Sequence, residues 1–171
     1  NKTRKYLGMT HKQYRKTLSI LRTRINIVEK LMSENRWDEI EFDKIPSRAG
    51  FIYKNAFARR DIIKAKYEAF AKDENTKVNA KTLYPYECVA EAMRVTNSGW
   101  GYYGRNTSDV DRAMINKYWA NLEDYIKGAT FNGMAIVDTS GSMCGSNADA
   151  PINVAISLGM YCAEKAKGPY A

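Results

Sequence analysis

Three oxygen-bearing side chains alternate along one loop near the C-terminal end of the sequence: Asp138, Ser140 and Ser142. In a loop that turns, side chains two residues apart can converge on one point. One carboxylate and two hydroxyls are hard ligands, which suit Mg²⁺, Mn²⁺ or Ca²⁺. Gly141 lies between the two serines and lets the backbone turn sharply. The spacing therefore predicts a divalent-metal site at these residues.

The elements on either side of this loop predict where the site would lie. Before it, residues 134–137 (MAIV) have the length and β-branched content of a buried strand. After it, the apolar pattern from Pro151 onward predicts a helix. Strand, loop and helix would form the first unit of an α/β, Rossmann-like sheet, in which ligands bind at the C-terminal ends of the strands.

Enzymatic chemistry fits the same loop poorly. Residues 138–141 (DTSG) resemble the Asp-Thr-Gly of aspartic proteases, but a serine separates the threonine from the glycine. A nucleophile elbow needs Gly-x-Ser-x-Gly, and Ser142 stands one place too early. His11 is the one histidine and is distant in sequence, so a serine triad lacks its usual base. We expect no enzyme; a strand-to-helix loop that binds nothing is the remaining alternative.

The pattern Asp-x-Ser-x-Ser after an apolar strand resembles the metal-ion-dependent adhesion site (MIDAS) of von Willebrand factor A (vWA) domains. The resemblance implies that Ser140 and Ser142 bind Mg²⁺ directly, that Asp138 binds it directly or through water, and that an acidic partner completes the coordination. A complete vWA domain supplies further ligands from two later loops and has a central sheet. We therefore expect an incomplete site, with the missing sheet supplied by residues beyond Ala171 or by another chain.

The composition limits the setting of this chain of 171 residues. Its three cysteines are far apart and form no CxxC pair, which favours a reducing, cytoplasmic location and argues against a zinc site. No apolar run approaches the roughly 20 residues that span a bilayer, so we expect no membrane partner. The sequence starts with Asn1 and stops directly after a predicted helix, so we expect a fragment at both ends.

The net charge of +8 is concentrated at the N-terminal end, where residues 1–24 contain eight Lys and Arg and no acid. Thr10 and Gln13 have the spacing of a capping box, and apolar residues at steps of four and three predict one helix from Thr10 to Met32. Four basic residues fall mostly opposite the apolar stripe and are the predicted nucleic-acid contacts: Lys12, Arg15, Lys16 and Arg22. A merely solvated charged face is the alternative.

Further helices are predicted over residues 47–72, with Ser47 as cap, from Pro85 to near Asn97, and from Thr107 or Ser108 to Gly128. The aromatic, glycine-rich stretch between the last two, residues 97–106, would either stack on nucleobases or insert its rings into the core. These patterns predict a mainly α, HEAT-like basic helical domain over residues 1–128. The first strand and helix of a vWA domain would follow over residues 129–171.

A wider resemblance rests on three motifs: residues 82–87 (TLYPYE), Tyr118-Trp119 and residues 136–143 (IVDTSGSM). Together they resemble proteins that join a helical-repeat part to a vWA domain, similar in layout to the TROVE proteins, the Ro ribonucleoproteins. The resemblance implies an RNA-binding, ribonucleoprotein-like scaffold that binds structured RNA. The alternatives are a metal-dependent protein-interaction module and a virion or assembly component without nucleic-acid binding.

Overall fold

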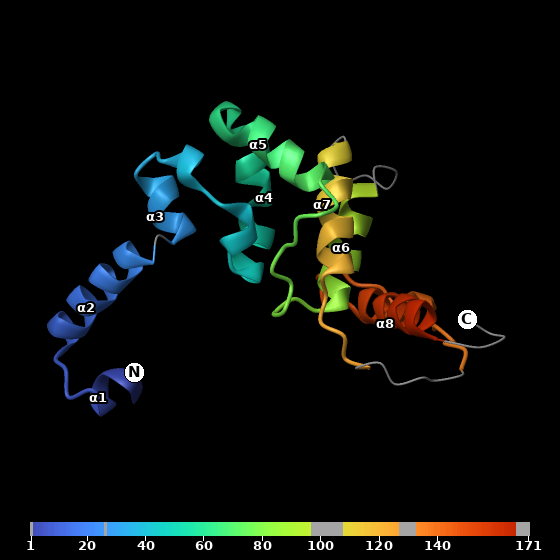
Figure 1. The fold of residues 1–171 in the computed structure, drawn as a ribbon. Coiled ribbons are helices and arrows are strands. Elements are labelled where there is room, and N and C mark those ends of the chain that lie inside the picture. The colour runs from blue at the N-terminus through green and yellow to red at the C-terminus, as the bar shows by residue number, and fades with distance from the viewer. Residues whose placement is uncertain (1, 26, 97–107, 127–132, 167–171) are drawn as a thin grey trace.

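The computed structural model describes residues 2–25, 27–96, 108–126 and 133–166, and these residues form a mainly helical structure without a β-strand (Figure 1). Eight α-helices lie within these ranges: α1 Lys2–Tyr6, α2 His11–Arg24, α3 Val28–Ser33, α4 Ser47–Arg59, α5 Asp61–Lys72, α6 Pro85–Thr96, α7 Asp109–Ala120 and α8 Pro151–Lys165. Three short 3₁₀ turns accompany them: η1 Trp37–Glu39, η2 Phe42–Lys44 and η3 Gly141–Met143.

The first long helix begins where the sequence predicts and ends earlier. The capping box is confirmed, because the Thr10 N–H donates to Gln13 Oε1 at 2.9 Å and the Gln13 N–H donates to Thr10 Oγ1 at 3.3 Å. The prediction of one continuous helix to Met32 was wrong. Helix α2 ends at Arg24, and Ile27 is extended (φ −61°, ψ 143°) before α3 begins. No residue of α2 is buried, so no packing holds the predicted stripe in one helix.

The acidic segment after α3, residues 37–45, contributes to the core in spite of its charge. Its four apolar side chains are buried, and the acids between them are exposed. This pattern comes from η1 and η2, because residues three apart in a 3₁₀ turn lie on the same side. The buried residues are Trp37, Ile40, Phe42 and Ile45.

The single helix predicted over residues 47–72 is two helices in the structure. The chain breaks at Arg60, whose backbone is extended (φ −87°, ψ 113°), so α4 and α5 can pack against each other. Ser47 is not the cap that was predicted: it is buried in the first turn of α4, and Pro46 precedes it. Ile52 is 59% exposed on α4.

The next two helices start as predicted. Pro85 opens α6, and Ser108 forms a capping box with Asp111 at the start of α7. However, α7 ends at Ala120 and not near Gly128. Gly128 and the aromatic stretch over residues 97–106 lie outside the described residues.

The core lies among α4, α5, α6, α7 and the acidic segment. Phe42 is in its centre, with edge-on contacts to Phe57 and Tyr67 at ring-centroid distances of 5.4 and 5.1 Å. Ile63 and Leu83 are fully buried beside this aromatic group. In contrast, α1 and α2 extend away from the core (Figure 1).

The predicted strand over residues 134–137 is not confirmed, because these residues form no ladder within the described part of the chain. Ile136 is 89% exposed and Met134 is 69% exposed, whereas a buried strand needs neighbours on its edges and cover on its faces. Val137 instead lies against α8 at Gly159. The helix predicted from Pro151 is confirmed as α8.

Helix α8 packs against α6 and is attached to the segment that follows α7. The Tyr161 hydroxyl accepts the Tyr125 N–H at 2.9 Å and donates to the Glu123 carbonyl at 3.2 Å. Trp119 Nε1 donates to Glu164 Oε2 at 2.8 Å. These contacts fix α8, and with it the loop that carries Asp138, Ser140 and Ser142, against the helical core.

Candidate functional site

The loop before α8 brings the three predicted metal ligands close together. The Ser140 N–H donates to Asp138 Oδ1 at 2.9 Å, and the hydroxyl oxygens of Ser140 and Ser142 are 3.2 Å apart. The turn η3 causes this convergence, because the Met143 N–H bonds back to the Ser140 carbonyl at 3.0 Å. All three side chains are exposed, so an ion from solvent can reach them.

The donor set fits a hard divalent cation. Magnesium binds oxygen at about 2.0–2.1 Å in octahedral geometry, so neighbouring ligands lie about 2.9 Å apart. The 3.2 Å between the two hydroxyls is close to that separation. Within the described residues no group of three or more His, Cys, Asp or Glu is placed to hold a metal.

Asp138 is held in its charged form. The pKa of its carboxyl group lies below the ordinary value because the backbone N–H and the side chain of Ser140 donate to it. A carboxylate that stays ionised is available to a cation at neutral pH. The loop thus presents an ionised carboxylate beside two hydroxyls, and the ligand set that the spacing predicts stays a prediction.

A cavity of about 550 Å³ separates the loop after the metal motif from α4 and α6. One wall includes Glu91 and Arg94, and the other includes Cys144, Ser146 and Asn153. Asn153 is buried and donates to the Ala148 carbonyl at 3.1 Å, so it fixes the loop at the start of α8. The candidate metal loop is therefore placed next to the polar side of α6.

The predicted nucleic-acid contacts all lie on α2. Lys12, Arg15, Lys16 and Arg22 are exposed, and within the described ranges none of them forms an ion pair. Helix α1 adds Arg4 and Lys5 in its last turn. A helix with several unneutralised cations and no acid attracts phosphate groups. The metal loop and this basic face lie at opposite ends of the molecule, so the structure does not bring the two predicted sites together (Figure 1).

Sequence reasoning missed a buried charge network between α4 and α6. Lys54 is only 7% exposed, and its Nζ lies 3.2 Å from Glu91 Oε1. Glu91 also binds Arg94, while Arg48 binds Glu87. Lys54 and Glu91 lie on different helices and are far apart in sequence, so no local pattern could predict that they pair.

No helix in the described part of the chain is long and apolar enough to cross a membrane. Among solved structures, none matches this chain. A protein of Acanthamoeba polyphaga mimivirus, described as uncharacterized, is 35% identical over 182 residues. The match covers 98% of this chain and 29% of the relative, so the chain spans less than a third of that relative's length.

A family described as "Domain of unknown function (DUF2828)" matches residues 1–130. The match contains all the helices from α1 to α7, including the basic residues of α2. It ends before Asp138, so the candidate metal loop lies outside it. Because the match covers most of the chain, the chain belongs to the DUF2828 family.

Proposed function

We propose that this chain is an RNA-binding, ribonucleoprotein-like scaffold without catalytic activity, which holds structured RNA on α1 and α2. The observation that carries the proposal is the charge of residues 1–24, where eight Lys and Arg stand without an acid. Four of these, on α2, are exposed and without an ion pair among the described residues. Phosphate groups are the partner that such a surface favours, because each contact releases condensed counterions.

Neutralising the four residues of α2 tests this proposal. We expect the combined variant Lys12→Gln, Arg15→Gln, Lys16→Gln and Arg22→Gln to bind a fluorescent RNA hairpin at least about 100-fold more weakly at low salt. The matched control neutralises four exposed lysines elsewhere, at positions 64, 72, 77 and 81. Equal loss in the two variants would mean that binding follows net charge and does not reside on α2.

The second part of the proposal concerns the loop before α8. Residues 134–165 would be the first strand and helix of a vWA-like unit, and Asp138, Ser140 and Ser142 would hold Mg²⁺, Mn²⁺ or Ca²⁺. The bound ion would offer an open position to an acidic group of a partner protein. The converging hydroxyls and the ionised carboxylate support this proposal, as does the exposed side chain of Ile136, which the rest of a vWA-like unit would cover.

Paramagnetic broadening tests the metal site with the ion itself. Adding Mn²⁺ to the isotope-labelled chain should broaden the amide signals of residues 138–143 and leave those of α5 sharp. Asp138→Asn, Ser140→Ala and Ser142→Ala should each reduce the broadening, whereas Ser146→Ala, an exposed serine of the same loop, should not. Unchanged broadening in all three ligand variants would overturn the assignment.

A protein-interaction module without RNA is the second candidate, and the geometry of the metal loop favours it. In that case partner capture depends on the divalent ion and on Ser140, and the α2 variant has no effect on it. An EDTA-sensitive interaction that survives nuclease treatment and neutralisation of α2 would support this candidate over the RNA scaffold.

A further inference from the structure

A cleft of about 460 Å³ lies between α2 and α3. It exists because the chain breaks at Ile27, whose extended backbone changes the direction of the chain between the two helices. In one continuous helix Arg15 and Ser33 would be about 27 Å apart, at a rise of about 1.5 Å for each residue. In the structure both residues line the same cleft. The break that the helical pattern did not predict therefore creates this cavity.

The cleft is lined by cationic and hydroxylated side chains from both helices. Arg15, Ser19 and Arg22 follow one another at steps of four and three, so they lie on one face of α2. Lys30 of α3 reaches across the cleft, and its Nζ donates to Thr23 Oγ1 at 2.7 Å. Guanidinium, ammonium and hydroxyl groups are the side-chain donors that bind phosphate oxygens. The cleft thus offers one ligand donors from two helices.

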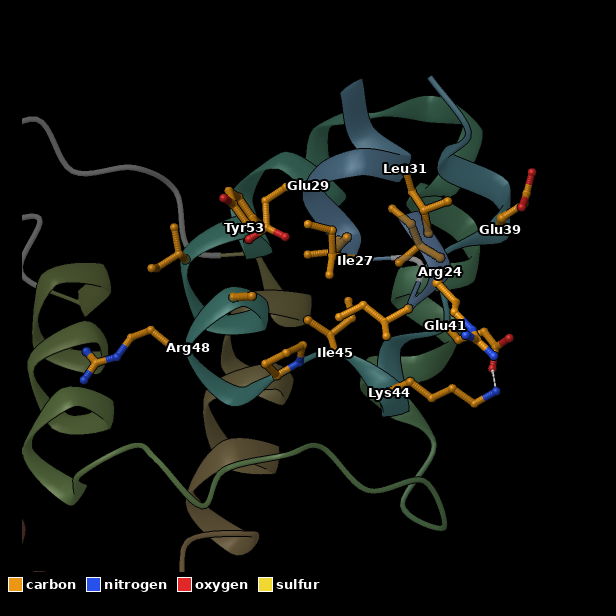
Figure 2. Close-up of a pocket in the computed structure, with 16 residues that line it drawn as sticks. Arg24, Ile27, Glu29, Leu31, Glu39, Glu41, Lys44, Ile45, Arg48 and Tyr53 are labelled. Atoms are coloured by element: carbon orange, nitrogen blue, oxygen red, sulfur yellow. Dashed lines mark ion pairs between the residues drawn. The ribbon is translucent and has the colours of Figure 1, made fainter. Parts of the chain in front are cut away.

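The charge of the cleft favours an anion. Arg15 and Arg22 form no ion pair within the part of the chain that the structure describes. Among the described residues that line the cleft, Glu29 is the one acid. It lies beside Tyr53 of α4 (Figure 2), and burial together with the Glu29 charge raises the pKa of Tyr53. The carboxylate of Glu29 is therefore engaged with α4, and the two arginines stay available.

The third base, Lys30, has only a weak competitor for its charge. Its Nζ lies 3.3 Å from Glu34 Oε1, in a pair whose two side chains are both partly exposed. Surface pairs of this kind contribute little to stability, so a phosphate group can take the place of the carboxylate. Even with Glu34 counted, the bases at the cleft outnumber the acids by three to two.

A second groove beside α3 has no such excess of charge. This groove, of about 720 Å³, lies between α3, the acidic segment and α4 (Figure 2). Its charged lining residues are three bases and three acids: Arg24, Lys44, Arg48, Glu29, Glu39 and Glu41. An anion is therefore expected in the cleft between α2 and α3, and not in the larger groove.

We propose that the cleft between α2 and α3 is a phosphate-binding site for the RNA backbone. Arg22 of α2 and Lys30 of α3 hold one phosphate group between the helices, and Arg15, two helical turns away, binds a neighbouring phosphate of the same strand. The cleft is within the range of roughly 300–1,000 Å³ of small-ligand sites, so it has room for the attached sugar. The inference rests on the proposed function and deepens it, because it adds a residue of α3 to the RNA contacts.

A matched pair of lysine variants tests the site. Lys30→Gln should weaken binding of an RNA hairpin about 10-fold at low salt and make the salt slope shallower by about 1, whatever the hairpin sequence. Lys44→Gln is the control, because Lys44 also pairs with a glutamate nearby in sequence but lines the larger groove. Equal losses in the two variants would mean that only net charge matters, and the inference would be wrong.

Glu34→Gln separates the phosphate contact from a structural role of the ion pair. It breaks the same pair but leaves the Lys30 ammonium in place, so RNA binding should stay at the wild-type level or become tighter. If Glu34→Gln weakens binding as much as Lys30→Gln does, the pair acts by holding α3 in position and the phosphate contact is refuted.

A nuclear magnetic resonance titration identifies the source of the phosphate. The RNA hairpin should shift the side-chain Nε signals of Arg15 and Arg22, and inorganic phosphate should do so only at far higher concentration. A hairpin that binds through α2 but is unaffected by Lys30→Gln would leave the proposed function standing and overturn this site. Shifts with inorganic phosphate and none with the hairpin would keep the phosphate site and overturn the RNA scaffold. No shift with either ligand would overturn both.

Discussion

Two buried lysines join helices at positions where a charge is otherwise costly. Lys54 on α4 reaches Glu91 on α6, donates to the Phe51 carbonyl at 3.1 Å and lies over the Phe51 ring. Lys117 on α7 donates to the carbonyl oxygens of Phe70 and Asp73 at 2.5 and 2.6 Å, at the C-terminal end of α5. Each ammonium group therefore replaces lost water with protein oxygens, as a buried charge requires.

Removing the charge of Glu91 should destabilise the chain in a pH-dependent way. Burial alone would raise the pKa of Glu91, but the hydrogen bond from Arg94 and the charge of Lys54 outweigh burial and lower it. Glu91→Gln should cost about 3 kcal/mol of unfolding free energy at pH 7, because it leaves Lys54 buried without its counter-charge. Since the folded-state pKa is lowered, this stabilisation is complete above the ordinary value of 4.5 and disappears as the pH falls through the lowered pKa.

Urea unfolding of wild type and Glu91→Gln at several pH values measures this difference. The two free energies of unfolding should converge in acid. Between about pH 6 and 8, above the ordinary Glu pKa, the difference between them should stay constant. The paired replacement Lys54→Met with Glu91→Leu should cost less than Glu91→Gln, because it removes both charges. A constant difference at all pH values would show that the pairing with Lys54 contributes nothing.

Lys117→Met should also destabilise the core. The variant removes the charged donor from three acceptors, which are the two carbonyl oxygens and Thr76 Oγ1 at 2.6 Å. A hydrogen bond from a charged group contributes about 2 kcal/mol to the free energy of unfolding. Thermal unfolding should show a clear fall in the melting temperature. The control is Lys72→Met, since Lys72 is exposed near the same end of α5 and should be neutral. Equal melting temperatures for the two variants would contradict this role of Lys117.

At the scale of elements, the starts of α2, α6 and α7 follow from local chemistry, whereas the breaks inside the predicted helices do not. The capping box at Thr10, the cap at Ser108 and the proline at the start of α6 depend only on residues of the first helical turn, so they could be predicted from the sequence. The breaks at Ile27 and Arg60 carry no glycine or proline. They place α3 and α5 against the core, and this tertiary requirement is not visible in the local pattern.

The candidate site shows the same division. The alternation of Asp138, Ser140 and Ser142 was sufficient to predict that their oxygens converge, because the turn that joins them is local. The strand predicted before them was not confirmed, since a strand depends on partners that spacing does not supply. Lys54 and the groove between α3 and α4 went unpredicted because residues distant in sequence form them.

Gly159 on α8 should be intolerant of any side chain. A Cβ atom there would lie 2.4 Å from Val137 Cγ2, closer than packed atoms approach. Helix propensity alone favours Gly159→Ala by about 1 kcal/mol, so a net destabilisation would reveal the clash. We expect that destabilisation, and we expect Val137→Ala to reverse it in the double variant. Gly141→Ala is the control, because nothing lies within 4 Å of that position, and it should leave the melting temperature unchanged.

On the scale of the whole molecule, charge divides the chain into regions of different character. The N-terminal helices are basic and exposed, the acidic segment and α4 border a groove with both apolar and charged side chains, and the loop before α8 presents hard oxygen atoms. Contacts of Tyr161 and Trp119 attach α8, and with it the candidate metal loop, to the core, whereas no residue of α2 is buried. An RNA bound at one end and an acidic partner bound at the other would not compete for the same surface.

The salt dependence of RNA binding tests the central claim most directly. The logarithm of the association constant falls by about 0.9 per phosphate contact for each unit of log salt concentration on duplex nucleic acid. Neutralising Lys12, Arg15, Lys16 and Arg22 should therefore make the slope for an RNA hairpin shallower by about 3 to 4. RNA binding on α2 requires this change of slope. Equal slopes for that variant and wild type would contradict it.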